Sequence, residues 1–404
     1  MLDRIRSLPR TIWALGLVSM FMDISSEMIH SLLPVFLVTV LGASPALLGL
    51  IEGLGEATAS VTKVFSGWLS DRLGRRKMLT VLGYGLAAVT KPIFPLAVTP
   101  VEVLAARFVD RLGKGLRDAP RDALVADVTP ENLRGAGFGL RQALDTVGGF
   151  VGPLAAVGLM AALNDNMRAV FAFAIIPAAL AVLVLVFGVK ETKGSRQAGA
   201  AKAPISWPRV RAIGRPFWIA LAVGVLFSMA RFSEAFLVLR GRDVGLPLAL
   251  LPFVYIVMNV VSAIASTPAG SLSDTLGRKS LLASGVAVLI VADGFLALTG
   301  GVTGVLIGVG LWGLHLGLTQ GLLAALVADT APARLRGTAF GLFNLATGAA
   351  TLAASALAGA IWSARGASPT FLTGGAFALV ALCGVLVLLK EKRADDGARS
   401  GVSR

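Results

Sequence analysis

A short polar turn occurs twice in the chain, and long apolar runs flank both copies. The copies are residues 67–77 and 270–279, and both read Gly-x-Leu-Ser-Asp-x-x-Gly-Arg. A second pair, Leu-Val-Ala-Asp followed by Leu-Arg-Gly, repeats at nearly the same offset in residues 124–135 and 326–337. The chain is therefore predicted to be two copies of one membrane unit, an arrangement with which many transporters open a path to alternate sides.

The composition predicts that lipid surrounds most of the chain. Apolar residues make up 55% and charged residues 15% of it, whereas a soluble protein carries roughly 25% charge. A membrane helix needs about 20 apolar residues, and twelve such runs are found. They are 11–39, 46–69, 78–98, 101–126, 134–161, 168–189, 215–240, 247–271, 279–299, 303–328, 336–362 and 369–390. Because backbone groups must be paired in hydrocarbon, the predicted fold class is an all-α membrane protein with twelve transmembrane helices.

Basic residues are concentrated in alternate loops between these runs, which accounts for the net charge of +14. The basic segments lie before residue 11 and at 72–77, 190–215, 278–279 and 390–393, and the intervening loops hold few such residues. This asymmetry follows the positive-inside rule and predicts that both termini are cytoplasmic. The positive charge is therefore interpreted as a signal of topology, and no nucleic-acid partner is expected.

One long polar segment divides the chain into halves. The predicted units are an N-terminal six-helix bundle (1–189), a cytoplasmic linker (190–214), a C-terminal six-helix bundle (215–390) and a cytoplasmic tail (391–404). The two bundles are expected to be pseudo-symmetric because of the repeats. The single cysteine, Cys383, allows no disulfide framework.

Ionisable residues inside the predicted spans are candidate functional groups, because burying them in a bilayer costs free energy. Asp23, Glu27 and His30 in the first span are spaced i, i+4, i+7 and share one helical face. The other candidates for proton coupling or substrate binding are Glu52, Glu56, Arg107, Arg111, Arg231, Glu234 and His315. The N-terminal half is richer in such groups, so charge-dependent coupling is expected there and a more apolar wall in the C-terminal half.

Three interpretations of the first-span face remain open at this stage. Asp23 or Glu27 could carry the proton, with Arg107 nearby, because a shielded carboxyl group can exchange protons during a transport cycle. Alternatively, the protein could export a divalent metal or metal chelate that Asp23, Glu27 and His30 bind, since carboxylate and imidazole together suit such ions. In the third interpretation the charges form internal ion pairs that hold the helices together, for example Glu52 or Glu56 with Arg107 or Lys91.

Twelve spans, a central polar loop and the twice-used turn together resemble the major facilitator superfamily over nearly the whole chain. Residues 107–115 are similar to the family's Arg/Gly-rich fourth-helix motif. Residues 148–153, Gly-Gly-Phe-Val-Gly-Pro, resemble the Gly-Pro motif of its proton-driven efflux members, although the glycine spacing after Pro153 departs from that pattern. The resemblance implies a secondary active transporter rather than an enzyme, a multi-pass protein of the inner or plasma membrane that moves a small solute or ion, with proton-coupled efflux by alternating access.

The resemblance also implies that the repeated turns act as cytoplasmic gates. The gating candidates are Gly67, Asp71, Arg72, Arg75, Arg76, Gly270, Asp274 and Arg278. The alternative is that these basic loops only set topology. No phosphate-binding loop of the Gly-x-x-x-x-Gly-Lys-Ser/Thr kind is present, so no cofactor is expected and a proton gradient is the predicted energy source. Family members of this type are expected to work as monomers.

Overall fold

The computed structural model describes residues 7–189, 210, 213–319, 321–332 and 335–388, without the side chains of 71, 131, 267 and 270–276. These residues form helices and no strand. In the first half they are α2 (Arg10–His30), α3 (Leu33–Val35), η1 (Phe36–Val40), α4 (Pro45–Leu73), α5 (Arg76–Thr90), α6 (Ile93–Leu96), α7 (Pro100–Val128), η2 (Glu131–Leu133), α8 (Arg134–Ala162), α9 (Met167–Phe173) and α10 (Ile175–Gly188). In the second half they are α12 (Arg215–Ala230), α13 (Ala235–Asp243), η3 (Leu248–Leu250), α14 (Phe253–Leu276), α15 (Arg278–Leu298), α16 (Val302–Thr319), α17 (Leu322–Thr330), α18 (Arg336–Arg365) and α19 (Ala367–Leu388).

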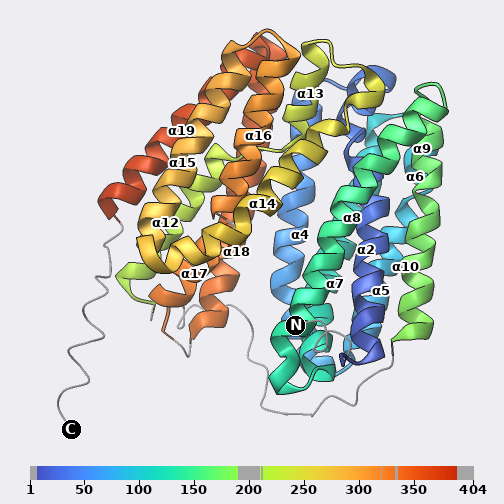
Figure 1. The fold of residues 1–404 in the computed structure, drawn as a ribbon, viewed down its shortest axis with the longest axis vertical. Helices are drawn as coiled ribbons and strands as arrows, with labels where there is room; N and C mark the ends of the chain where they lie inside the picture. The colour runs from blue at the N-terminus through green and yellow to red at the C-terminus, as the bar shows by residue number, and fades with distance from the viewer. Residues whose placement is uncertain (1–6, 190–209, 211–212, 320, 333–334, 389–404) are drawn as a thin grey trace.

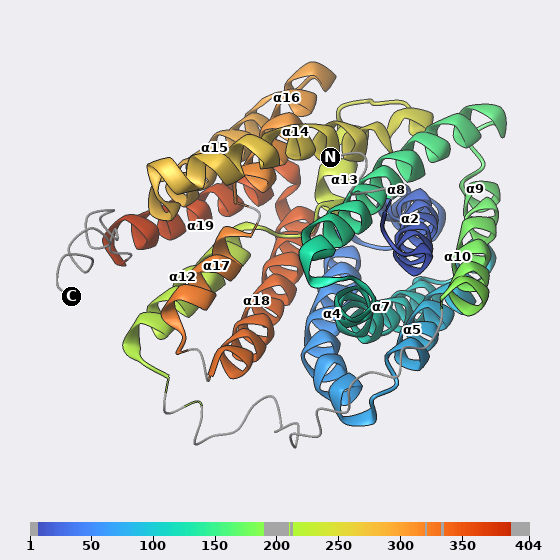
Figure 2. The ribbon, with the colours of Figure 1, turned by 60° about the horizontal axis from the view of Figure 1, so that its bottom comes forward.

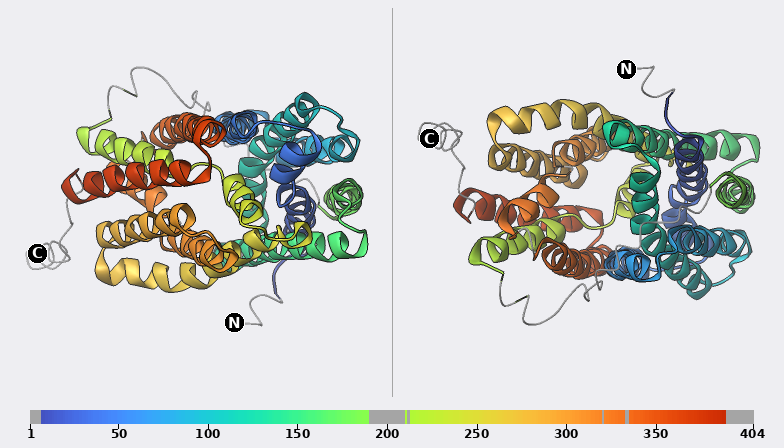
Figure 3. Two further views of the ribbon diagram at one scale, coloured as in Figure 1. Left: turned by 90° about the horizontal axis from the view of Figure 1, so that it is seen from above. Right: turned by 90° about the horizontal axis from the view of Figure 1, so that it is seen from below.

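The helices form two groups that stand side by side (Figure 1). The views along the long axis show α2 to α10 on one side and α12 to α19 on the other (Figure 3). We call these groups the N bundle and the C bundle. The residues that divide them, 190–209 and 211–212, and the tail 391–404 lie outside the described residues, so the domain boundaries stay a prediction.

Ten helical segments of the described residues are long and apolar enough to cross a membrane. The helices α4 and α7, each 29 residues long, are not among these ten. Both carry charged side chains that line the cavity inside the protein, Glu52 and Glu56 from α4 and Arg107, Arg111 and Lys114 from α7, and such charges lower the mean hydropathy of a span. The prediction of an all-helical membrane protein is therefore confirmed, while the count of twelve spans and the cytoplasmic termini stay predictions.

Local sequence signals explain where α4 and α7 begin. The Oγ of Ser44 accepts a hydrogen bond from Leu47 N at 3.2 Å, and Pro45 follows at the first helical position, where a missing N–H costs nothing. Thr99 and Glu102 form a capping box at the start of α7. Helix α4 ends at Gly74, whose φ of +61° suits glycine. Between these ends α4 packs along α7, so the charged middle turns of the two helices lie side by side.

Glycines let helices approach closely at two places that position the site. Within the N bundle, Gly148 and Gly152 of α8 face the backbone of α2 at Met20 and Ile24. Between the bundles, α4 packs along α18, and Gly359 of α18 faces the backbone of Pro45. Figure 2 shows α4 and α18 as neighbours at the junction of the bundles. Small residues allow such backbone contact inside membranes.

Candidate functional site

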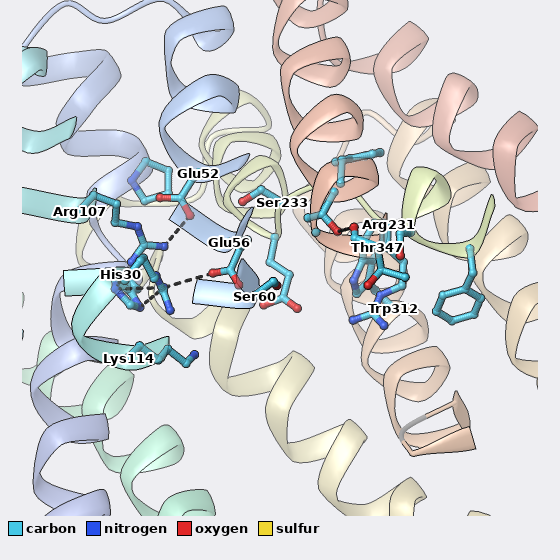
Figure 4. Close-up of a pocket in the computed structure, with 18 of the residues that line it drawn as sticks. His30, Glu52, Glu56, Ser60, Arg107, Lys114, Arg231, Ser233, Trp312 and Thr347 are labelled. Atoms are coloured by element: carbon cyan, nitrogen blue, oxygen red, sulfur yellow. Dashed lines mark hydrogen bonds and ion pairs between the residues drawn. The ribbon is translucent and has the colours of Figure 1, made fainter. Parts of the chain in front are cut away.

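A cavity of about 470 Å³ lies between the two bundles. Its lining changes character across the junction, because the N bundle contributes mainly charged groups and the C bundle mainly aromatic and hydroxyl side chains. From the N bundle come Glu27, His30, Glu52, Glu56, Arg107, Arg111 and Lys114. Figure 4 shows His30, Glu52, Glu56, Arg107 and Lys114 on one side of the cavity, opposite Arg231, Trp312 and Thr347. The sequence-based expectation that charge concentrates in the N-terminal half agrees with this lining.

A buried ion pair anchors the N-bundle wall. The Nη2 of Arg107 donates to Glu52 Oε2 at 2.6 Å, and the Glu52 side chain is only 8% exposed. The Nη1 of Arg107 also contacts His30 Nε2. Since an arginine carries no acceptor and stays charged, the imidazole nitrogen must accept this hydrogen bond. The sequence named Glu52 or Glu56 as possible partners of Arg107 or Lys91. The structure brings Glu52 and Arg107 together, whereas Lys91 pairs with Asp110 at 3.0 Å.

A second, looser pair lies beside the first. Arg111 Nη2 stands 3.5 Å from Glu56 Oε1, and the Glu56 side chain is 42% exposed to the cavity. Glu27 Oε1 lies 3.6 Å from His30 Nδ1 and its side chain is 26% exposed. Glu27 and Glu56 are therefore the carboxylates of this wall that water and solute reach most easily.

Asp23 and His315 do not line the cavity, although both are candidates from the sequence. Asp23 lies one turn away from Glu27 and faces Gly148 of α8. His315 Nδ1 donates to the carbonyl oxygen of Gly285 at 2.7 Å, and its ring packs against Phe227 at 5.3 Å. A shared helical face in the sequence thus places residues on one stripe, but only part of that stripe meets the cavity.

The C-bundle wall contains a break in a helix that the sequence suggested was continuous. The predicted span 215–240 is divided into α12 and α13, and the linking residues 231–234 all line the cavity. The Ser233 amide donates to Ser355 Oγ at 3.1 Å, and Ser233 Oγ accepts from the Ala235 amide at 3.2 Å. Serine side chains therefore replace the helical partners of the broken turn, which is how irregular backbone is tolerated beside a cavity. Neither glycine nor proline marks this break.

Arg231 and Glu234 stand at the two ends of this break and line the cavity. Both are candidates from the sequence. The Arg231 guanidinium lies over the Phe227 ring, 5.6 Å from its centroid. Phe232, Tyr255, Trp312 and Phe343 complete the aromatic surface, and the sequence analysis missed them. Aromatic residues in an apolar run look alike whether they face lipid or a cavity; only Tyr255, one of two tyrosines in the chain, gave a signal that could have been noticed.

The geometry does not favour a metal site on the first-span face. Among the described residues, no group of three His, Cys, Asp or Glu side chains converges to hold a metal ion. The imidazole of His30 is instead flanked by the guanidinium groups of Arg107 and Arg111. Two fixed positive charges beside the only imidazole of this face oppose a bound cation.

The repeated sequence segments form matching contacts at the same end of each bundle. Arg76 pairs with Asp127 and donates to the Ala123 carbonyl at 3.2 Å. Arg278 pairs with Asp329 and donates to the Ala325 carbonyl at 3.3 Å. The two repeats seen in the sequence are therefore contact partners, since an arginine at or next to the end of each turn meets the aspartate of the repeated Leu-Val-Ala-Asp segment. In the second copy this is the motif arginine Arg278, and in the first copy it is Arg76, the residue after the motif arginine Arg75.

The remaining gating candidates are placed as follows. Arg72 lies over the ring of Trp68, 5.4 Å from its centroid. Arg75 is exposed and precedes α5, and Gly67 lies within α4. The side chains of Asp71 and Asp274, and Gly270, lie outside the described residues, although the helices α4 and α14 run through their positions.

Comparison with known proteins identifies the family. The profile of the Major Facilitator Superfamily matches residues 15–352 and 235–403. The chain belongs to this superfamily. An uncharacterized MFS-type transporter of Methanocaldococcus jannaschii is 31% identical over 396 residues, covering 95% of both chains. The inner membrane transport protein YajR of Escherichia coli K12 is 25% identical over 387 residues, covering 92% of this chain and 81% of YajR.

Solved structures of this superfamily share the fold. The nucleoside transporter NupG superposes with a TM-score of 0.78 over 94% of this chain and 100% of its own, at 13% sequence identity. At that identity the likeness shows the fold alone. The chain is thus a multi-pass membrane protein and a secondary transporter of some solute, and its superfamily is one of transporters rather than enzymes.

Proposed function

We propose that this superfamily member is a proton-coupled transporter that exports a small solute by alternating access, with twelve spans and both termini in the cytoplasm. The observation that carries the proposal is the charged wall of the central cavity. It combines one tight, buried ion pair with carboxylates that remain open to the cavity. The proposal needs no cofactor and takes the proton gradient as its energy source, with the monomer as the working unit.

Glu56 is the proposed proton carrier, with Glu27 as its neighbour in the same role. A carrier must meet water in at least one state of the cycle and must hold a partner that it can release. Glu56 meets both requirements, because it is 42% exposed and its partner Arg111 stands at 3.5 Å rather than in a short hydrogen bond. Protonation of Glu56 would remove one negative charge and free Arg111 for other contacts.

Glu52 and Arg107 are proposed to hold the wall in place rather than to carry protons. Their 2.6 Å contact is almost completely buried, so each charge depends on the other. His30 accepts from Arg107 and lies beside Glu27. Protonation of Glu27 would therefore alter the electrostatic environment of Arg107 through the His30 ring that lies between them.

Two features support alternating access and export. The extended α4–α18 contact, in which the Ala46 amide donates to Ser363 Oγ at 2.9 Å, is proposed to close one end of the cavity. The Gly-Pro motif that resembles proton-driven exporters packs directly against α2 at Glu27, because Gly152 faces the Glu27 Cβ and the Ile24 backbone. A movement of α8 would therefore reach a proposed proton site. The pairs Arg76–Asp127 and Arg278–Asp329 are the proposed gate contacts at the cytoplasmic end.

The test is a flux measurement on purified protein in proteoliposomes that contain a pH-sensitive dye. Ligands are first selected by thermal shift from a panel of amino acids, organic acids, nucleosides, lipophilic cations and divalent metals. For a ligand that binds, an imposed pH gradient should drive solute and proton movement in opposite directions, and a protonophore should abolish net transport. Glu56→Gln should abolish the response to the gradient while exchange of labelled for unlabelled solute persists.

The matched control is Asp165→Asn, which neutralises an exposed carboxylate in the loop after α8. It should behave as wild type. Transport that ignores the pH gradient in the wild-type protein would overturn proton coupling, and solute and protons moving together would overturn export.

A further inference from the structure

The charged groups of the cavity are balanced in number but not all paired. Its lining contains four carboxylates and four permanent cations. The carboxylates are Glu27, Glu52, Glu56 and Glu234, and the cations are Arg107, Arg111, Lys114 and Arg231. A cavity with no net charge gives its best electrostatic match to a solute that also has no net charge.

The C-bundle wall holds one unpaired charge of each sign. Among the described residues, the Arg231 guanidinium has no carboxylate within 4.0 Å and donates no hydrogen bond; it lies over the Phe227 ring. Glu234 likewise has no ion pair or side-chain hydrogen bond in the described part of the chain. The two residues are three positions apart across the helix break, yet their side chains form no ion pair with each other. An unpaired charge that faces a cavity is costly unless a ligand or water completes it.

The N-bundle wall differs, because its cations already have acidic neighbours. Arg107 and Arg111 pair with Glu52 and Glu56. Lys114, which has no ion pair of its own among the described residues, lies within electrostatic reach of Glu27 and Glu56. Arg231, by contrast, has Glu234 as its acidic neighbour within electrostatic reach, and the ring of His315 also lies within reach of its charge. The open positions for a charged solute are therefore on the C-bundle side.

Backbone geometry keeps Arg231 and Glu234 apart. Arg231 ends α12, where its amide donates to the Ser228 carbonyl at 3.2 Å. Glu234 immediately precedes α13, whose N-terminus favours a negative charge. The Ser233 bonds to Ser355 and Ala235 fix the chain between them. The break thus presents a cation and an anion at fixed positions rather than a collapsed ion pair.

An apolar surface lies beside these two charges. Phe227, Phe232, Trp312 and Phe343 line the same wall, and Phe232 packs against Trp312 with ring centroids 5.6 Å apart. Burial of a flat hydrocarbon group against such rings contributes favourable free energy that charge pairing alone does not. Solutes without an apolar body would gain nothing from the ring edges that line the cavity.

We propose that the cavity binds a zwitterionic solute with an aromatic or apolar body, its anionic group on Arg231, its ammonium group on Glu234 and its body against the aromatic wall. This inference rests on the proposed transport function and names its substrate class. A single solute of this kind completes both unpaired charges and leaves the cavity neutral. An organic anion would complete Arg231 and leave Glu234 unpaired, and an organic cation would do the reverse.

The test compares two matched sets of probes by thermal shift and isothermal titration. One set is phenylalanine, 3-phenylpropanoate and phenethylamine, which share a ring and differ in charge. The other is 4-(aminomethyl)benzoate, 4-methylbenzoate and 4-methylbenzylamine, which covers a wider spacing between the charges. The zwitterion of at least one set should bind at least roughly tenfold more tightly than both of its partners, since each lost charge-assisted hydrogen bond has about that effect.

Substitutions then test the two assigned charges. Arg231→Gln should weaken zwitterion binding by roughly tenfold or more and shift the preference toward the amine probe, and Glu234→Gln should shift it toward the acid probe. Arg242→Gln and Asp243→Asn are matched controls, because both side chains are exposed on the same helix α13. Arg231→Lys, which keeps the charge, should retain the preference for the zwitterion, and a monodisperse protein with wild-type melting temperature shows that each variant folds.

The results separate this inference from the proposed function. Equal or tighter binding of an acid or amine probe, or binding of none of the six probes, overturns the zwitterion proposal. A zwitterion that binds as expected but moves without response to a pH gradient overturns proton coupling and leaves the substrate class standing. Gradient-driven flux of a solute that is not a zwitterion would overturn the substrate class and leave proton coupling standing.

Discussion

The close contact between α4 and α18 predicts that one added methyl group will open the cavity at the end where these helices meet. Gly359 of α18 has no side chain, and a Cβ built there would lie 3.0 Å from Ala46 Cα and 3.2 Å from the carbonyl carbon of Pro45. These are backbone atoms, so no side-chain rotation relieves the contact. We expect Gly359→Ala to destabilise the conformation in which this end is closed, and to leave the conformation in which the helices separate unaffected.

The size of the effect follows from the cost of overpacking. An extra methyl group in a packed interior typically costs about 1–3 kcal/mol. Applied to one of two conformations, this cost changes their ratio by roughly 5- to 150-fold. Replacing glycine by alanine within a helix also contributes up to about 1 kcal/mol of helix propensity, but both conformations gain it equally. Gly158→Ala in α8 is the matched control, because nothing lies within 4 Å of its added Cβ.

The assay is a distance measurement between nitroxide labels at Val40 and Arg365, which are exposed near the meeting end of the helices. Cys383 is exposed and is first replaced by serine, which leaves no other cysteine in the chain. Double electron–electron resonance on the Gly359→Ala protein should show a new population at longer distance. A distribution equal to that of wild type or of Gly158→Ala would refute the argument that this contact controls opening.

Three further predictions concern stability. Arg107→Gln leaves Glu52 buried without its cation and should lower the free energy of unfolding by about 3–5 kcal/mol. This should appear as a large fall in melting temperature, which adding Glu52→Gln to the same chain partly reverses. A small fall would contradict the dependence of each charge on the other. Asp293 is 1% exposed and both its carboxylate oxygens lack hydrogen-bond partners among the described residues, so Asp293→Leu should raise the melting temperature by removing a penalty of about 1–3 kcal/mol; a lower melting temperature would show that the carboxyl group has a stabilising role. Asp127→Asn and Asp329→Asn should each lower the free energy of unfolding by less than about 1 kcal/mol, because these side chains are 28% and 44% exposed. A loss as large as that of Arg107→Gln would argue against a reversible gate contact.

The sequence could predict the contact between its two repeats only in part. The copies of the turn and of Leu-Val-Ala-Asp recur at nearly equal offsets because the two bundles repeat one unit. In each half the arginine that begins the helix after the turn then meets the aspartate of the second segment, Arg76 with Asp127 and Arg278 with Asp329. Repetition shows that four segments correspond, but their pairing depends on how α5 packs against α7 and α15 against α17.

The candidate site shows the same limit more sharply. Helical spacing places Asp23, Glu27 and His30 on one face, yet Glu27 and His30 reach the cavity while Asp23 faces α8. Spacing determines angles around one helix axis, whereas the cavity exists only where the other helices leave space. The partners of His30 are likewise set by α7, a helix that begins some seventy positions later in the chain.

The amino-acid sequence by itself determined that lipid surrounds most of the chain, that the chain is helical and that its two halves repeat one unit. Long apolar runs with few charges require lipid and therefore helices, and these are properties of local composition. The break between α12 and α13 was decided by tertiary structure, because no glycine or proline marks residues 231–234 and the freed amides are satisfied by Ser233 itself and by Ser355 from α18, more than a hundred positions away. Where the free energy of a local feature depends on a partner that distant, only the folded chain can supply it.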